Sequence, residues 1–339
     1  MRPALQLLPD FIDALGLTGP WTYAGLFLAA SILMMWRLES MLEHGLEGTA
    51  LGTVVMPYCS GLGNLIFVGL IAARGGPVRE VMTNCLVNNI TNLTLLLGVP
   101  ALAWGLAVVP NRAPARGGRK GKGADTGPQL NRLSLLLTLA AVAFFTGAVW
   151  VLGRDGQLDF QDGLILIGLF LFWQCFQVFD VLKHNVARRR SFGPGFYLDA
   201  LVVLACAYGL YASIDWLMAW LGQRHGGFVS AAHLGWLSGW LMVLPNALLA
   251  LYWGWRRRAD IVYSSQVGDG HICIPLCLGL CALARPVPVA GFADTGLLLL
   301  VGAAALHAGF LLALGGLPRW AGWLFAGAYG WFLYAGLLA

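Results

Sequence analysis

The sequence predicts an all-α polytopic membrane protein with about ten transmembrane helices in two inverted five-helix repeats. The first observation is composition: the 339 residues are 58% hydrophobic and only 11% charged, with a mean hydropathy of +0.72. Soluble globular chains carry roughly 25% charged residues. This composition excludes soluble enzymes, nucleic-acid-binding modules and disordered proteins, and it makes the lipid bilayer the first expected partner.

The second observation is the number of apolar runs. A transmembrane helix needs about 20 mostly apolar residues, and ten runs approach or exceed this length. The second and seventh runs contain Pro57, Gly61, Gly63 and Pro245, which predict broken helices. The predicted spans are 21–43, 47–73, 80–108, 133–153, 160–182, 197–221, 229–255, 261–283, 291–313 and 318–338.

The chain divides into two halves of five spans each. Residues 1–182 form the first predicted repeat, which includes a Gly-, Arg- and Lys-rich cytoplasmic loop at 110–132. Residues 183–196 form a cytoplasmic linker, and residues 197–339 form the second repeat. The composition of the 110–132 loop is that of a flexible linker.

The third observation is the distribution of Lys and Arg among the loops. The loops after the third, fifth, seventh and ninth spans hold fourteen of these residues, from Arg112 to Arg319, and the opposite side holds six. Basic loops stay in the cytoplasm, so both termini are expected outside a cell (inner) membrane. With five spans per half, the second half enters with inverted orientation, as in inverted-repeat transporters.

Polar residues recur at matching places in the two halves. Asn84, Asn88 and Asn92 are spaced by four in the third span, and so are Ser265, Asp269 and Cys273 in the eighth. Residues four apart share a helix face. Asn64 precedes Asn88 by 24 positions, and Asn246 precedes Asp269 by 23. Because polar groups in hydrocarbon are costly unless they face a partner or a water-filled cavity, these stripes predict a midplane site between the repeats.

The second half resembles the calcium/cation antiporter superfamily, sodium/calcium exchanger type. Its segment PNALLALYWGWRRRADIVYSSQVGDGHICIPLCLGL runs from Pro245 to Leu280 and is similar to the second alpha repeat of that family, which has a GTSxPE-like and then a GSNxxN-like stretch. Pro245 takes the place of the family's proline and Asn246 that of its glutamate. Gly268, Asp269 and Cys273 stand for the glycine, the serine and the final asparagine of GSNxxN.

The first half resembles the first alpha repeat once one inserted residue is allowed. In SGLGNLIFVGLIAARGG, Asn64 stands at the family's glutamate. In TNCLVNNITNLTLLLG, Asn84 matches an upstream asparagine, Asn88 replaces the serine of GSNxxN, and Asn89 and Asn92 match both of its asparagines. Further upstream, Gly45 and Gly52 match family glycines. The resemblance is close over 35–108 and 235–283 and extends to the rest by topology.

The resemblance implies a cation site between the second, third, seventh and eighth spans, in which two glutamates of the family are replaced by Asn. Asn carbonyls still bind hard cations, but Asp269 is the only charge left. This predicts one monovalent cation, or a proton on Asp269, in preference to calcium. No resident cofactor is expected beyond a bound Na⁺, Ca²⁺ or other cation. The predicted ligands are Asn64, Asn88, Asn92, Asn246, Asp269 and Cys273.

Two hypotheses of function follow. The first is a secondary cation transporter with an altered, low-charge site. The second, motivated by the missing glutamates, is a transport-inactive homologue that serves as a membrane subunit or scaffold for a partner protein. Asparagine also bonds helices together, and Asp269 could lock the eighth span by a hydrogen bond or salt bridge. No pair of residues is arranged for acid–base or nucleophilic chemistry, so no enzymatic activity and no nucleic-acid partner are expected.

The seven cysteines lie in apolar stretches and include no CxxC pair, so neither a disulfide framework nor a zinc or redox motif is predicted. Cys273, Cys277 and Cys281 form a stripe, with His271 close by. Thiolates and imidazole bind soft metals, but small cysteines also pack well between helices. Packing is the favoured interpretation, because His271 points away from the cysteine face, so no metal is expected besides the transported cation.

Overall fold

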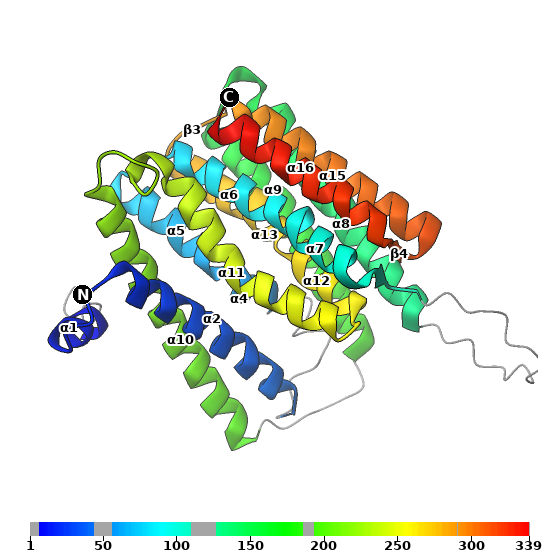
Figure 1. Cartoon of the computed structure of the whole chain (residues 1–339), viewed down its shortest axis with the longest axis horizontal. Helices are drawn as coiled ribbons and strands as arrows, with labels where there is room; N and C mark the ends of the chain where they lie inside the picture. Colours follow the sequence, from blue (N-terminus) through cyan, green and yellow to red (C-terminus); the bar gives the residue numbers. More distant parts are fainter. Residues whose placement is uncertain (1–6, 44–55, 110–126, 186–192, 290, 339) are drawn as a thin grey trace, which may run out of the picture.

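The protein is a bundle of long, apolar helices in the computed structural model, which describes residues 7–43, 56–109, 127–185, 193–289 and 291–338 (Figure 1). The helices of the first half are α1 Leu7–Ala14, α2 Pro20–Glu43, α4 Met56–Ser60, α5 Leu62–Arg74, α6 Arg79–Leu93, α7 Leu95–Trp104, α8 Gly127–Leu152 and α9 Phe160–Asn185. Those of the second half are α10 Pro194–Gly222, α11 Leu234–Trp255, α12 Ala259–Gly268, α13 Gly270–Ile272, α14 Leu278–Ala284, α15 Phe292–Leu314 and α16 Arg319–Leu337.

The fold class predicted from the sequence is confirmed. Within the described ranges, eight helical segments are long and apolar enough to cross a membrane, and Leu62–Arg74 is a shorter apolar helix. These nine and the 19-residue α16 lie at the ten predicted positions. In an apolar solvent the backbone must satisfy its own hydrogen bonds, which explains the almost wholly helical chain.

Two predicted connections are shorter in the structure. Helix α8 begins at Gly127, so the end of the expected 110–132 loop is helical. Helix α9 extends to Asn185 and α10 begins at Pro194, which trims the expected 183–196 linker from both sides. Gly45 and Gly52 lie outside the described residues. So do the basic residues Arg112, Arg116, Arg119, Lys120, Lys122, Arg188, Arg189 and Arg190.

The helix breaks lie partly where they were expected. The second span is broken at Gly61, between α4 and α5. The break expected at Pro245 is wrong, because α11 runs through this proline without interruption. A proline removes one backbone hydrogen bond, and packing on both sides of α11 tolerates that loss. The third span instead breaks at Thr94, and the eighth span breaks around Asp269.

Contacts between elements repeat in the two halves. Strand β1 Leu106–Ala107, after the third span, pairs with β4 Gly316–Leu317, between the ninth and tenth. Strand β3 Val287–Pro288, after the eighth span, pairs with β2 Gln157–Leu158, between the fourth and fifth. The labels β3 and β4 lie at opposite ends of the bundle in Figure 1. Each repeat therefore closes one end of the other, as expected for an inverted pair.

Two glycine crossings follow the same symmetry. Helix α16 crosses α7 where a Cβ on Gly322 would lie 2.5 Å from the carbonyl oxygen of Gly98. Helix α9 crosses α14 where a Cβ on Gly163 would lie 3.0 Å from the carbonyl oxygen of Gly279. Small residues let membrane helices approach this closely. Both crossings fasten an outer helix of one half to the third or eighth span, and these two spans form the centre of the molecule.

Candidate functional site

Asp269 lies at the centre of the bundle and is 1% exposed. Its Oδ1 accepts a hydrogen bond of 2.6 Å from Ser60 Oγ at the end of α4. Its Oδ2 accepts one of 3.3 Å from Asn92 Nδ2 on α6 and another from Asn246 Nδ2 on α11. Neutral donors from the second, third and seventh spans therefore hold one carboxylate that comes from the eighth.

The backbone around Asp269 is irregular. Helix α12 ends at Gly268, α13 covers only Gly270–Ile272, and a π-helical turn occupies Cys273–Cys277. Pro275 lies in this turn and has no N–H to donate to the preceding turn. Short π segments inside α-helices occur frequently at functional sites. The interruption sets Asp269 and Cys273 toward α6, where their partners lie.

Two bonds cross between the third and eighth spans in a symmetric pattern. Asn88 and Asn92 are four residues apart on α6, as Asp269 and Cys273 are on the eighth span. The later residue of α6, Asn92, donates to the earlier residue of the eighth span, Asp269. In return, Asn88 Nδ2 donates to Cys273 Sγ at 3.1 Å. Asn92 Nδ2 also lies 3.4 Å from Asn88 Oδ1, which joins both bonds into one network.

Several buried oxygens around this network have no partner among the described residues. They are amide oxygens, whose lone pairs are the type of ligand that hard cations accept. Buried polar atoms are normally hydrogen-bonded, and each exception calls for an explanation. The unpartnered amide oxygens are Asn64 Oδ1, Asn84 Oδ1, Asn92 Oδ1 and Gln266 Oε1. Of these residues, Asn92 is bonded to Asp269 and Gln266 to the backbone of Asn246, whereas Asn84 is bonded to Ser238 one turn away.

The fold of this chain is similar to solved structures of a sodium-calcium exchanger. A structure of the sodium-calcium exchanger NCX_Mj soaked with Na⁺ and Sr²⁺ matches with a TM-score of 0.63 and 18% identity over 95% of this chain and 98% of that one. A second NCX_Mj structure gives a TM-score of 0.61 and 18% identity over 94% and 96%. The profile of the sodium/calcium exchanger protein family matches residues 21–179. No curated protein sequence matches significantly.

This chain has the sodium/calcium exchanger fold. The structural likeness covers nearly the whole length of both chains, so it includes both halves. The identity is low, however, and the likeness therefore establishes the fold alone. The family profile supports the same type of protein over the first half. Within this fold, the side chains around Asp269 determine which ligand the site can bind.

The protein has a cavity on one side of Asp269. A cavity of about 530 Å³ is lined by Glu39, Tyr252 and Ser264 toward the ends of their helices, and by Ser60 and Asn246 at its inner end. Ser60 and Asn246 are two of the three donors to Asp269. The cavity thus reaches two donors of Asp269, while the carboxylate itself lies buried behind them.

The opposite side is closed in this structure. A second cavity, of about 510 Å³, is lined by Trp21, Leu221 and Met242 and does not reach Ser60 or Asn246. A narrow space of about 10 Å³, bordered by Phe27, Met242 and Asn246, lies beside the site on this side. The cavity on the side of Glu39 therefore reaches donors of Asp269, and the cavity beside Trp21 does not.

The structure places the six predicted ligands unequally. Asn92, Asn246 and Asp269 are bonded to one another, and Asn88 and Cys273 join them through the crossed pair. Asn64 is buried, at 1% exposure, but no hydrogen bond joins it to these five in the described part of the chain.

Sequence reasoning missed two residues of this site. Ser60 precedes Asn64 by four residues, but the break at Gly61 places the two on separate helices, so the spacing rule does not apply to Ser60. Gln266 donates from Nε2 to the backbone oxygen of Asn246 at 3.2 Å. It lies off the stripe formed by Ser265, Asp269 and Cys273, so the four-residue spacing does not select it.

In the described part of the chain, neither the cysteine stripe nor a histidine donates a hydrogen bond to Asp269, although Cys273 accepts one from Asn88. Among the described residues, no three His, Cys, Asp or Glu side chains are grouped so as to hold a metal ion. The His271 ring packs edge-on against Trp173, with centroids 6.2 Å apart. His307 Nε2 lies 2.7 Å from the oxygen of Leu93 and Nδ1 lies 3.2 Å from the hydroxyl of Tyr263. Since a carbonyl only accepts, His307 donates from Nε2 and ties the third span to the eighth.

Proposed function

We propose that this protein is a secondary cation transporter of the sodium/calcium exchanger type whose site carries a single carboxylate. The fold and the family profile indicate a membrane cation transporter. The observation that carries the finer proposal is Asp269, which is buried at the centre and held by donors from three other spans. An acidic residue within a membrane span is rare and usually functional.

The charge of the site favours a monovalent cation or a proton. Calcium takes six to eight oxygen ligands, with carboxylates prominent among them. Here the positions that resemble the family's glutamates hold Asn64 and Asn246, so Asp269 supplies the only formal charge among the proposed ligands. A monovalent cation on one carboxylate leaves the site neutral, whereas a divalent cation leaves it with an uncompensated positive charge in a low dielectric.

The ligands we propose are Asp269 together with the amide oxygens of Asn64, Asn88, Asn92 and Asn246, with Cys273 at the edge of the site. The unpartnered oxygens of Asn64 and Asn92 support this assignment. On binding, the cation takes the place of the amide N–H groups that now face the carboxylate, and the amides present their oxygens instead. Ser60 and Gln266 complete the wall of the site.

Transport would proceed by alternating access between the two repeats. We assign them to residues 1–182 and 197–339, with 183–196 as the linker. The cavity that ends at Ser60 and Asn246 is the open side, and the Phe27–Met242 contact region is the closed one. We assign the open side to the cytoplasm of a cell (inner) membrane and both termini to the outside, because the basic Arg257 and Arg319 lie at the end where Tyr252 lies.

The test is thermal unfolding of the purified protein with a panel of Na⁺, K⁺, Ca²⁺, Mn²⁺ and protons at constant ionic strength. A ligand that binds only the folded state stabilises it by about 2.7 kcal/mol at roughly 100 times its Kd. We expect one monovalent cation, or acid, to stabilise the wild type and to lose this effect in Asp269→Asn. Arg154→Gln, at the far end of α8, is the matched control and should keep the response.

A second candidate function is a transport-inactive membrane subunit for a partner protein. The observation that favours it is that the donors from Ser60, Asn92 and Asn246 already satisfy Asp269 without a cation. This hypothesis predicts a flat response to the whole panel and a stable membrane-protein partner after gentle detergent extraction. A cation response that Asp269→Asn removes would refute it.

A further inference from the structure

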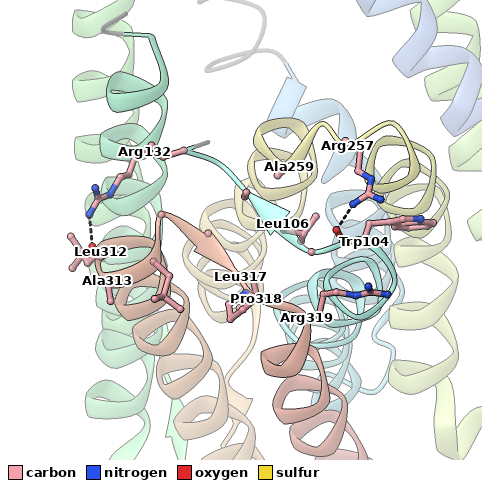
Figure 2. Close-up of a pocket in the computed structure, with 16 residues that line it drawn as sticks. Trp104, Leu106, Arg132, Arg257, Ala259, Leu312, Ala313, Leu317, Pro318 and Arg319 are labelled. Atoms are coloured by element: carbon pink, nitrogen blue, oxygen red, sulfur yellow. Dashed lines mark hydrogen bonds between the residues drawn. The ribbon is translucent and has the colours of Figure 1, made fainter. Parts of the chain in front are cut away.

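Another cavity, separate from the two described above, lies at one end of the bundle, away from Asp269. Its volume is about 700 Å³, and it lies among the ends of α7, α12, α15 and α16 and the start of α8 (Figure 2). Apolar side chains such as Leu106, Leu317 and Pro318 form part of its wall. Strands β1 and β4, which close this end of the bundle, run along it. The proposed cation transport leaves this cavity unexplained.

Three arginines from three separate segments line the cavity. Arg132 lies near the start of α8, Arg257 follows α11, and Arg319 begins α16. Figure 2 shows Arg132 on one side and Arg257 and Arg319 on the other. Among the described lining residues there is no Asp or Glu. The nearest acid in sequence, Asp260, pairs with Arg258 at 3.1 Å and is not part of the wall.

Each arginine is anchored but keeps free donors. Arg132 Nη2 donates to the oxygen of Leu312 at 2.7 Å, and Arg257 Nη1 donates to that of Trp104 at 2.5 Å. Arg319 donates from Nε and Nη2 to the oxygens of Leu102 and Ala103, both at 2.9 Å. A guanidinium has five N–H groups, so these bonds use one or two per side chain. The anchors fix the positions of the three charges and leave the other N–H groups available to a ligand.

The backbone at Arg257 supports a role for its side chain. Arg257 has a φ of +59° and is the only described non-glycine residue with a positive φ. Its N–H bonds to Gly254 and that of Arg258 bonds to Trp253, which is the helix ending that usually places glycine at this position. An L-residue in this conformation is strained, because its Cβ lies too close to the following carbonyl oxygen. The chain therefore keeps a guanidinium where glycine would be the less strained choice.

We propose that this cavity binds a phosphate-bearing anion. Three fixed guanidinium groups with free N–H donors suit the oxygens of a phosphate, to which arginine binds with charge-assisted and frequently bidentate hydrogen bonds. The apolar wall beside them suits a ligand with a hydrocarbon portion. An anionic phospholipid headgroup and a soluble phosphate share this chemistry, and the cavity lies at the end of the spans, where both have access.

The alternative is that the arginines only cap the exposed carbonyl groups at the ends of α7 and α15, which basic side chains do in many proteins. The two roles make different predictions for Arg257→Gly. Glycine adopts a positive φ without strain. If Arg257 serves only to bond the backbone, Arg257→Gly should change stability little and leave the response to anions unchanged. If Arg257 binds the anion, Arg257→Gly should again change stability little, but the response to anions should be lost.

The experiment measures thermal unfolding of the full-length protein in a neutral detergent at constant ionic strength. Three probes are titrated: dihexanoyl phosphatidylglycerol, inorganic phosphate and dihexanoyl phosphatidylcholine. We expect the anionic lipid or phosphate to raise the unfolding temperature and the zwitterionic lipid to have little effect. Removing one charged hydrogen-bond donor should raise the apparent Kd roughly tenfold or more in Arg257→Gly and in Arg319→Gln. Arg154→Gln, whose guanidinium stacks on Trp150 in another part of the protein, is the control.

The outcomes distinguish a lipid headgroup from a soluble anion and decide whether the cavity binds either. A shift with phosphatidylglycerol alone assigns the site to a lipid headgroup, and a shift with phosphate at similar concentration assigns it to a soluble anion. The proposal is overturned if neither anion shifts the unfolding temperature, if phosphatidylcholine acts as strongly as phosphatidylglycerol, or if Arg154→Gln weakens the response as much as Arg257→Gly.

Discussion

The third and eighth spans occupy equivalent places in the two halves, yet they present different chemistry to the centre. The third span brings no charged side chain to this place: Asn84, Asn88 and Asn92 lie on one face of α6, an uninterrupted helix at that point. The eighth span brings a carboxylate and a thiol, Asp269 and Cys273, on a backbone broken into short helices and a π turn. The fold is symmetric, but at these two matched positions the charge and the π turn belong to the eighth span.

This difference suggests how a symmetric scaffold produces one site instead of two. The third span sends both donors to the eighth, Asn92 to Asp269 and Asn88 to Cys273, so the two bonds join symmetry-related positions of the two halves. Only the bond to Asp269 involves a charge, and bonds to charged groups contribute about 1.5–3 kcal/mol, roughly twice those between neutral groups. A cation should therefore lie on the Asp269 side of the pseudo-twofold axis, with the Asn88 side as a neutral counterpart.

The largest effect is expected from removing the charge. Asp269→Ala should lower uptake of the stabilising cation into proteoliposomes by roughly a hundredfold, because it removes the only formal charge at the site. The equivalent change in the other half, Asn88→Ala, should lower uptake less than tenfold, because it removes one neutral ligand. Radiotracer or fluorescence uptake at matched protein density measures both.

Folding must be controlled in that comparison, since Asp269→Ala also leaves Ser60, Asn92 and Asn246 without their acceptor. Asp269→Asn keeps the shape and one acceptor oxygen while it removes the charge. If this variant elutes as a single species and still transports at the wild-type rate, the charge is not required, and the asymmetry between the halves has no role in transport.

The next effect comes from making the halves alike. Asn88→Asp places a second carboxylate at the position that mirrors Asp269. Two carboxylates among amide oxygens favour a divalent cation, so Ca²⁺ or Sr²⁺ should now raise the unfolding temperature, with little effect on the wild type. Without cations the variant should be less stable than the wild type, because two like charges lie close together at low dielectric.

Asn84→Asp is the matched control for this gain of function. Asn84 lies one turn before Asn88 on α6 and bonds to Ser238 at 2.9 Å instead of joining the crossed pair. A carboxylate there adds the same charge one turn away from the site. An equal response to Ca²⁺ in both variants would show that added charge alone, and not its place opposite Asp269, recruits the divalent ion.

Much of the architecture could be predicted from the sequence, because its causes are local. Apolar runs of spanning length and the parity of Lys and Arg are properties of short segments, and they gave the ten spans and the inverted topology. Four-residue spacing likewise selected Asn88, Asn92, Asp269 and Cys273. The structure brings these four into one hydrogen-bonded network with Asn246.

The remaining features depend on contacts between distant segments. Pro245 signals a break, yet α11 continues through it, because the surrounding helices decide whether one lost hydrogen bond ends a helix. Ser60 reaches Asp269 only because the break at Gly61 turns the end of α4 toward the eighth span. The cavity of Arg132, Arg257 and Arg319 joins three segments that are far apart in sequence. No spacing rule within one helix could bring these residues together.

The smallest effect is expected at the neutral one of the two crossed bonds, between Asn88 and Cys273. Cys273→Ser keeps a small side chain that accepts the bond from Asn88, and its oxygen is a harder ligand than sulfur. Hydrogen bonds between membrane helices average about 0.6 kcal/mol, so the unfolding free energy should change by less than about 1 kcal/mol. Cation affinity should change by less than roughly fivefold. Cys206→Ser, in a buried position on α10, controls for loss of a thiol as such. A loss of cation response in Cys273→Ser as large as that in Asp269→Asn would place the cation between the two halves. Asn88 and Cys273 would then belong to the site as fully as Asp269 does.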